Sequence, residues 1–482
     1  MGATLEQGRP LWALFVVCAG VLMVSLDTTV VTVALPSIVA DFPLEHPSLS
    51  WLFNAYLLTF GGLLVVAGRS GDLYGSRRVF IGGMCVFTAS SLLCGVARSF
   101  LLLVLCRAVQ GIGAALVSAV SLSLITGLFV DPSKRTWALG IYGLVSALGG
   151  AIGDVLGGLL TGALNWHWIF LVNVLPGVGI VASGLSLLPH EKAKRRLGHL
   201  DLIGTSLLVS SSSLLVLTIV NAKDFGWGSW QTAAEAGGVA LLACAFCSKD
   251  RRARAPLIPS TLFRLRSFRV GNLVGALFTA GTFGWFVGSA LYLQGVLGYS
   301  ALEVGLAYLP AEVFTAIFAG GLSARVIARF GIEKPLCVGL ISVAVGFALF
   351  GRGPAPGYGW DVFPGMVLMG LGAGLAYTPL LMLSLQDVPV QDSGVGSGVL
   401  NMSFMLGGAI GVALVANAIS AEAIAPSNGD IAATSPSHGY HLGFAISSAS
   451  ILCAFLFAAS ALGRLPRQYS GESSSIAPAE LK

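Results

Sequence analysis

Four ionisable side chains lie inside long apolar stretches of this sequence, where a charge is costly and therefore informative. They are Asp27, Arg107, Asp154 and Glu312. A charge at the centre of a bilayer costs about 2.5–3.5 kcal/mol even on the lower scales, so such residues usually face a cavity or a partner. A carboxyl group in an apolar cavity can exchange a proton near neutral pH, whereas a guanidinium stays charged and must be paired or hydrated. The four residues therefore indicate proton-exchange chemistry inside a membrane.

Asp27 and Arg107 stand in two different apolar segments. Asp27 lies in LDTTVVTVALP, ahead of Pro36, and either exchanges protons or makes a structural hydrogen bond to a neighbouring helix. Arg107 can tune a nearby acid, bind an anionic substrate or serve as a fixed hydrogen-bond hub. Gln110 follows it by three residues and adds a polar group to the same helical face.

Asp154 stands in a glycine-rich stretch, GIYGLVSALGGAIGDVLGGLLTG, at residues 140–162. At helical spacing the small residues form two neighbouring rows, one of Gly149, Gly153 and Gly157 and the other of Gly150, Asp154 and Gly158. Such rows let membrane helices approach closely. Within them Asp154 is either a coupling or substrate-binding group or a carboxylic acid kept protonated and hydrogen-bonded.

Two further features carry charge. Glu312 follows Pro310 and is a second proton site, an attractor of cationic substrate or a member of a pair at the outer membrane boundary. The segment GRSGDLYGSRR contains Gly68, Arg69, Asp72, Gly75, Arg77 and Arg78. We expect a tight loop in which Asp72 sits near a helix N-terminus and pairs with arginines as a gating latch. The alternative is a simple basic anchor at the membrane surface.

The composition indicates the class of fold that positions these residues. The chain has 482 residues, 55% of them hydrophobic and only 10% charged, with 63 glycines. Soluble domains are about 25% charged, and outer-membrane barrels show alternating segments of about ten residues, so both classes are excluded. The sequence predicts an all-α polytopic membrane protein. The net charge of +5 does not indicate nucleic-acid binding, and Cys244 and Cys247 are expected to pack as small apolar residues, with no metal or cofactor.

We predict fourteen membrane spans. Their expected first residues are Leu11, Trp51, Val79, Leu101, Trp137, Trp168, Leu202, Thr232, Val270, Glu303, Pro335, Asp361, Ser393 and Tyr440. With a cytoplasmic N-terminus, nearly all of the 27 lysines and arginines fall inside, and the exceptions are Arg98, Lys223, Arg352 and the intramembrane Arg107. This bias predicts that both termini are cytoplasmic.

Longer basic loops divide the chain into parts. We predict an N-terminal six-helix bundle at residues 1–188, a linker with spans 7 and 8 at 189–268, a C-terminal six-helix bundle at 269–467 and a disordered cytoplasmic tail at 468–482. The loop at residues 68–78 has a weak counterpart at residues 323–334. Paired six-helix halves are a transporter architecture with the substrate site between them.

Several motifs, in order along nearly the whole chain, resemble the fourteen-span drug:proton antiporter family of the major facilitator superfamily. These are LDTTVVTVALP, WLFNAYLL, GRSGDLYGSRR, the span-4 segment LCRAVQGIGAA, the glycine rows of span 5, LYLQGVLGYS, and GVGSGVLN followed by GGAIGVA. Two positions depart from the family pattern. Asp154 stands where proline is usual, and His167 stands where arginine is usual. A proline would weaken the helix through its backbone, which aspartate cannot do.

The resemblance implies roles for particular residues. Proton coupling would involve Asp27 and Arg107, with Asp154 and Glu312 as further candidates, and gating would involve residues 68–78. The substrate cavity is expected to include Asn54, Tyr56, Gln110, Tyr292 and Gln294.

The expected function is proton-driven export of small amphipathic compounds such as antibiotics by alternating access, by a monomer in the plasma membrane. The partners are then protons, the substrate and lipid. The alternatives are a dedicated metabolite exporter or a proton-coupled importer on the same fold, a membrane-embedded enzyme, or a sensor that does not transport.

Overall fold

The computed structural model describes residues 2–42, 50–129, 131–189, 201–253, 256–318, 322–350, 358–389, 393–423 and 438–462. Throughout these residues the regular structure is helical. The first half contains α1 (Gly2–Asp41), α2 (Ser50–Tyr74), α3 (Ser76–Gly95), α4 (Phe100–Leu128), α5 (Pro132–Ala163), α6 (Trp168–Leu171) and α7 (Val174–Leu187). Next come α8 (Leu202–Phe225), α9 (Trp230–Arg252) and a short 3-10 helix, η1 (Leu262–Arg264). The second half contains α10 (Arg266–Gly295), α11 (Ala301–Ile317), α12 (Ser323–Phe330), α13 (Glu333–Phe350), α14 (Tyr358–Asp361), α15 (Phe363–Leu385), α16 (Ser393–Ala423) and α17 (His438–Leu462).

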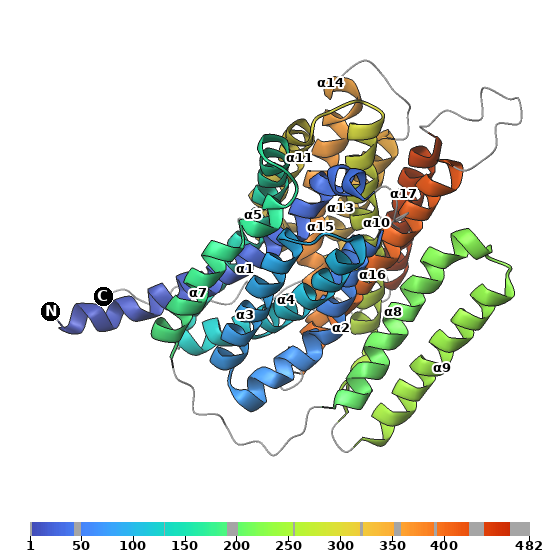
Figure 1. Ribbon diagram of the computed structural model, residues 1–482. Helices are drawn as coiled ribbons and strands as arrows, with labels where there is room; N and C mark the ends of the chain where they lie inside the picture. Colours follow the sequence, from blue (N-terminus) through green and yellow to red (C-terminus); the bar gives the residue numbers. More distant parts are fainter. Residues whose placement is uncertain are drawn as a thin grey trace, which may run out of the picture.

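The helices pack as two groups joined along two seams. Helices α1 to α7 pack on one another, and α10 to α17 form a second group (Figure 1). The groups meet mainly where α2 lies against α16 and where α5 lies against α11. The α8–α9 pair lies at the edge of the molecule, with α8 against α2 and α16.

Helix ends follow local chemistry. Ser99 caps α4 by accepting a hydrogen bond from the Leu102 amide, and Asp131 caps α5 ahead of Pro132. Both are side chains that satisfy a free N–H at a helix start. Between α2 and α3 the break is a single residue, Gly75, whose φ of 92° is a conformation that favours glycine.

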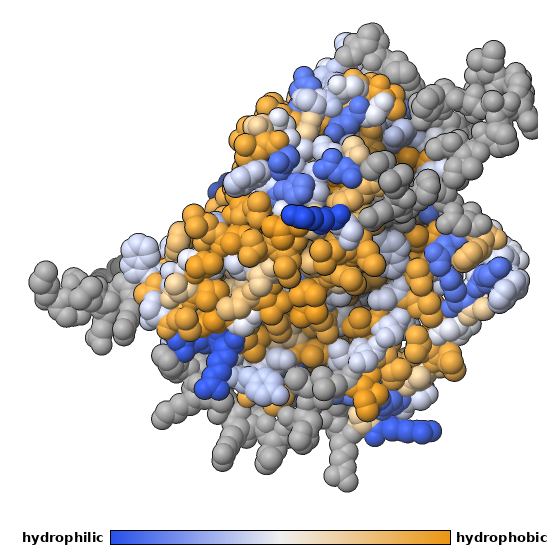
Figure 2. All heavy atoms as spheres, viewed as in Figure 1, coloured by the Kyte–Doolittle hydropathy of each residue, from blue (hydrophilic) through white to orange (hydrophobic). Residues whose placement is uncertain are grey.

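The hydropathy of the elements fits a membrane. Among the described residues, 12 helical segments are long and apolar enough to cross a bilayer. Figure 2 shows apolar residues gathered across the middle of one face, with hydrophilic residues mostly toward its ends. The predicted all-α membrane fold is thus confirmed. The count of fourteen spans stays a prediction, because α9 and the 17-residue α11 are not among the twelve segments.

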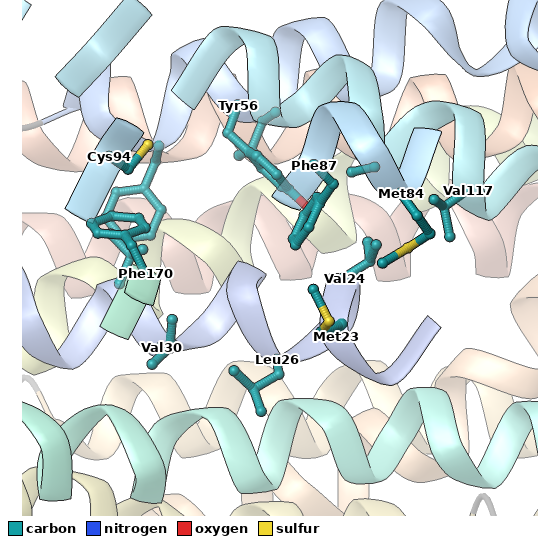
Figure 3. Packing of buried hydrophobic residues seen from close by; sticks show 14 of the residues in the cluster. Met23, Val24, Leu26, Val30, Tyr56, Met84, Phe87, Cys94, Val117 and Phe170 are labelled. Carbon is teal, nitrogen blue, oxygen red and sulfur yellow. The ribbon is translucent and has the colours of Figure 1, made fainter. Parts of the chain in front are cut away.

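The apolar core surrounds the inner face of α1. Figure 3 shows part of it, with Val24, Tyr56 and Met84 contributed by α1, α2 and α3. A second core cluster lies in the group of α10 to α17 and includes Trp285, Tyr308 and Phe347. Each cluster is centred on one helix group, although Val412 of α16 belongs to the first and Val33 of α1 to the second. Polar residues buried in either cluster need a specific explanation.

Candidate functional site

The centre of the first helix group holds a buried ion pair. Arg107 Nη1 of α4 lies 2.6 Å from Asp27 Oδ2 of α1, and both side chains are 0% exposed. Breaking such a pair leaves one charge buried and uncompensated, which is strongly unfavourable. Asp27 and Arg107 were each expected to face a cavity or a partner, and the structure makes them partners of each other.

Two amide side chains complete the network around the ion pair. Gln110 Nε2 donates to Asp27 Oδ1 at 2.8 Å, and Gln110 Oε1 accepts from Arg107 Nη1 at 2.7 Å. Asn173, at the start of α7, donates to the same Asp27 oxygen at 3.2 Å. Gln110 Nε2 also lies 2.8 Å from Ser91 Oγ of α3. The Asp27 side chain is therefore held by donors from two other elements, α4 and the start of α7, and the network is electrically neutral while Asp27 is ionised.

Aromatic rings enclose the guanidinium. Its central carbon lies 4.2 Å from the ring centroid of Tyr56 and 5.8 Å from that of Phe170. The Nε of Arg107 donates to the Leu52 carbonyl oxygen at 3.3 Å, while Nη2 is buried with no hydrogen-bond partner. Cation–π contact is strongest out of water, so these rings favour a permanently charged arginine here. Tyr56, one of the residues expected at the substrate cavity, packs against the guanidinium of the ion pair.

The row of Gly149, Gly153 and Gly157 on α5 faces α1. A Cβ on Gly153 would lie 2.1 Å from Thr29 Oγ1 and 2.7 Å from the Leu26 carbonyl oxygen. On Gly157 it would lie 2.7 Å from the Val30 carbonyl oxygen. These distances are too short for any side chain, so the glycines are required by close backbone approach. The same three residues of α1 flank Asp27, so α5 buttresses the helix that carries the ion pair.

The row of Gly150, Asp154 and Gly158 faces α11. A Cβ on Gly158 would lie 2.5 Å from the Ala301 carbonyl oxygen, whereas one on Gly150 would meet nothing nearer than Glu312 Oε2 at 3.7 Å. Asp154 is 0% exposed, and neither of its carboxyl oxygens has a hydrogen-bond partner in the described structure. Glu312 lies close enough to Asp154 for the two carboxyl groups to interact electrostatically. The structure thus brings Asp154 and Glu312 together, at a site apart from the Asp27–Arg107 pair.

The two rows offer a matched pair of substitutions. Gly153→Ala should lower the apparent unfolding temperature, because forcing a methyl group against the α1 backbone costs about 1–3 kcal/mol. Gly150→Ala, three residues earlier on the same helix, should change stability by no more than about 0.5 kcal/mol. Thermal unfolding of the purified variants in one detergent checks this. Equal effects of the two substitutions would contradict the assigned packing of the rows.

The motif at residues 68–78 differs from the expected loop. Helix α2 continues to Tyr74, so Asp72 lies in its last turn and not at the start of the next helix. The side chain of Asp72 lies outside the described part of the structure. Arg77 donates to the Leu185 carbonyl oxygen of α7, and Arg78 is exposed. Arg77 therefore joins α3 to α7 within the first helix group.

The third arginine of the motif, Arg69, lies near Asp201 at the start of α8. Asp201 caps that helix by accepting a hydrogen bond from the Gly204 amide, 2.8 Å away, and pairs with Lys249 of α9. Partial burial opposes ionisation of Asp201, but hydrogen bonds from Lys249 and Gly204, together with the charges of Lys249 and Arg69, lower its pKa. Arg69 is thus electrostatically linked to the α8–α9 pair.

The remaining cavity candidates are scattered. Gln294 Nε2 donates to the Val33 carbonyl oxygen at 2.9 Å and so joins α10 to α1. Tyr292 is 2% exposed and packs against Tyr440 and Phe444. Asn54 is 0% exposed, and neither its amide oxygen nor its nitrogen has a partner in the described structure. Of the five candidates, Gln110 and Tyr56 contact Arg107 of the ion pair, whereas Gln294 joins α10 to α1 and Tyr292 packs within the second helix group.

Asn173 is the polar partner of Asp27 that the sequence did not single out. It stands in the hydrophobic segment NWHWIFLVN, in which the departure from the family pattern is at His167. Its signal was weak because an asparagine at a helix start is usually a cap. Here it makes no cap hydrogen bond, and its side chain is turned to Asp27 instead.

Comparison with known proteins shows the family to which the chain belongs. The model of the Major Facilitator Superfamily matches residues 17–412. A puromycin resistance protein of Streptomyces alboniger is 36% identical over 92% of this chain and 90% of its own length. A cephamycin export protein of Amycolatopsis lactamdurans is 35% identical over 86% of each chain. A tetracenomycin C resistance and export protein of Streptomyces glaucescens is 31% identical over 85% of this chain and 76% of its own length.

A solved structure supports the fold independently. The crystal structure of a human organic anion transporter superposes with a TM-score of 0.63 at 17% identity, covering 93% of this chain and 99% of that one. At this identity the likeness concerns the fold alone. The family match along most of the sequence and the similarity to these exporters show that the chain belongs to the Major Facilitator Superfamily and is a membrane transporter, not an enzyme.

Proposed function

We propose that the chain is a proton-driven exporter of small amphipathic compounds, antibiotics among them, working as a monomer in the plasma membrane. The observation that carries this proposal is the buried network of Asp27, Arg107 and Gln110 inside a transporter fold. Relatives named for antibiotic resistance and export support the direction and the substrate class.

The proposed coupling follows from the charge of the network. With Asp27 ionised, its charge is balanced by Arg107; binding of a proton removes the negative charge and weakens the hydrogen bonds that Gln110 and Asn173 donate. Because these donors come from α4 and α7, a proton on Asp27 alters the contacts of α1 with its neighbours. A difference of this kind between two states is what lets a bound proton shift a conformational equilibrium. Asp154 and Glu312 are proposed as further proton-coupling residues.

We also propose fourteen spans with both termini in the cytoplasm. Helices α9, which has 23 residues and packs along α8, and α11, which packs between α5 and α15, would add two spans to the twelve. The distribution of lysine and arginine supports this orientation. The close contacts of α5 with α11 at Gly158 and Ala301 would then lie toward the outer face. The predicted domain boundaries and the gating role of residues 68–78 are part of the same proposal.

Expression in an antibiotic-sensitive bacterium tests the function. Cells that make the protein should survive higher concentrations of some members of a chemically varied set of antibiotics and dyes. They should also accumulate less of a fluorescent amphipathic dye such as ethidium, and a proton uncoupler should abolish the difference. Export of one metabolite alone, or greater uptake on expression, would favour the alternatives of a dedicated exporter or an importer. No change for any compound would contradict the proposal.

A further inference from the structure

The backbones of α5 and α11 are in direct contact on either side of Asp154. A Cβ on Gly305 would lie 2.6 Å from the Asp154 carbonyl oxygen, and one on Gly158 would lie 2.5 Å from the Ala301 carbonyl oxygen. Backbones this close leave no layer between the helices. Since α5 belongs to the first helix group and α11 to the second, this seam is one of the two surfaces along which the groups must separate in alternating access.

The seam contains two carboxyl groups without a compensating charge. Asp154 is fully buried with both oxygens unpartnered, and half-buried Glu312 has its Oε2 beside Gly150, one turn away along α5. The described residues contain two ion pairs, Arg107–Asp27 and Lys249–Asp201, and neither involves the seam. The pair would therefore carry two uncompensated negative charges if both groups were ionised.

The groups that face the pair do not supply a counter-charge either. From α11, Tyr308 is close enough to Asp154 to be affected by its charge, but the Tyr308 hydroxyl is engaged with Ser289 and the Phe286 carbonyl oxygen. From α1, Thr29 donates to the Gly150 carbonyl oxygen. Asp27, the other intramembrane acid of α1, is held by Arg107.

An ionised carboxylate that is buried without a donor or a cation is strongly disfavoured. A second carboxylate nearby adds repulsion, so the packed seam requires protons on the pair. Ionisation of the fully buried Asp154 would require water, and water can reach this side chain only when α5 and α11 move apart. The protonation of the pair and the packing of the seam are therefore linked.

We propose that Asp154 and Glu312 form one proton-binding unit whose protonation keeps α5 packed on α11 and whose deprotonation parts the seam. The proposal rests on the proposed proton-coupled transport and specifies which interface these two acids control. It separates them from Asp27, whose charge is balanced within a single helix group. A proton bound at the pair acts directly on the contact between the two groups.

Hydrogen–deuterium exchange of the full chain in lipid nanodiscs tests the proposal. After correction for the intrinsic rate, amides of α5 after Gly150 and of α11 should exchange about tenfold faster at about pH 8.5 than at about pH 5.5. In the double variant Asp154→Asn/Glu312→Gln, which mimics the protonated pair, they should stay protected at both values. The α13–α15 contact at Gly339 and Gly372 is an equally tight glycine packing, with Cβ positions 2.7 and 2.6 Å from the facing carbonyl oxygens, and serves as the internal control.

Two outcomes would overturn the proposal: no effect of pH on the seam of the wild-type chain, or the same effect in the double variant. At the lower pH the double variant should match the wild type, which verifies its fold. If it does not fold, Glu312→Gln alone carries the test, because this half-buried side chain tolerates the change and its loss should still reduce the effect of pH. Exchange is measured without substrate, so a failure of the export assay leaves this result interpretable, and the reverse also holds.

Discussion

Replacing Arg107 with methionine is expected to destabilise the chain by about 3–5 kcal/mol, the largest loss of stability that we predict. The substitution keeps an unbranched apolar chain between the Tyr56 and Phe170 rings but leaves the Asp27 carboxylate buried without its cation. It also removes the donor to the Leu52 carbonyl oxygen. The apparent unfolding temperature of the purified variant in detergent measures the effect.

Two further variants separate charge from packing. Arg98→Met removes an exposed arginine from the connection between α3 and α4 and should change stability by no more than about 0.5 kcal/mol. The double variant Asp27→Asn/Arg107→Met removes both charges and should recover much of the lost stability. If Arg107→Met unfolds at the wild-type temperature, or the double variant is no better than the single one, the ion pair does not hold α1 to α4 as described.

Replacing Asp27 with asparagine is expected to reduce efflux driven by a pH gradient by at least about tenfold, which corresponds to about 1.4 kcal/mol in the coupling step. Asparagine is similar in size and can still accept a hydrogen bond from Gln110 or Asn173, but it cannot bind and release a proton. The variant should therefore still bind substrate. Dye efflux from energised cells and dye binding to the purified protein measure the two properties.

The control for this substitution lies on the same helix. Asp41 is an exposed carboxylate near the end of α1 that accepts a hydrogen bond from Trp166 Nε1 at 2.6 Å. Asp41→Asn keeps an acceptor there and should transport like the wild type. Full pH-driven efflux by Asp27→Asn would remove Asp27 from the coupling mechanism, and an equal loss in Asp41→Asn would make the effect nonspecific.

Much of the helical architecture could be predicted because hydrophobic length and the position of basic residues are local properties of the sequence. The expected starts at Trp168, Leu202 and Ser393 coincide with the first residues of helices. The two glycine rows of α5 were also predictable, since helical periodicity alone places Gly153 and Asp154 on adjacent rows. The superfamily was predictable from the order of the motifs, and the match to the Major Facilitator Superfamily confirms it.

What could not be predicted depends on contacts between distant segments. Periodicity does not say that one row of α5 meets α1 and the other α11, so the meeting of Asp154 with Glu312 was not foreseen. Asn173 was missed because its partner, Asp27, lies on another helix. The prediction that Asp72 lies at the start of a helix is wrong for a local reason. One glycine, Gly75, suffices for the turn, and α2 therefore continues through the expected loop. The roles assigned to all these residues stay predictions.

The most direct test of the central claim is the movement of protons with substrate. The purified chain is reconstituted into liposomes that contain a pH-sensitive dye, and a gradient of an exported compound is imposed with no initial pH difference. We predict that substrate flux moves protons in the opposite direction, and that Asp27→Asn shows no such proton movement. Substrate flux by the wild-type chain with no change in internal pH would contradict proton-coupled export.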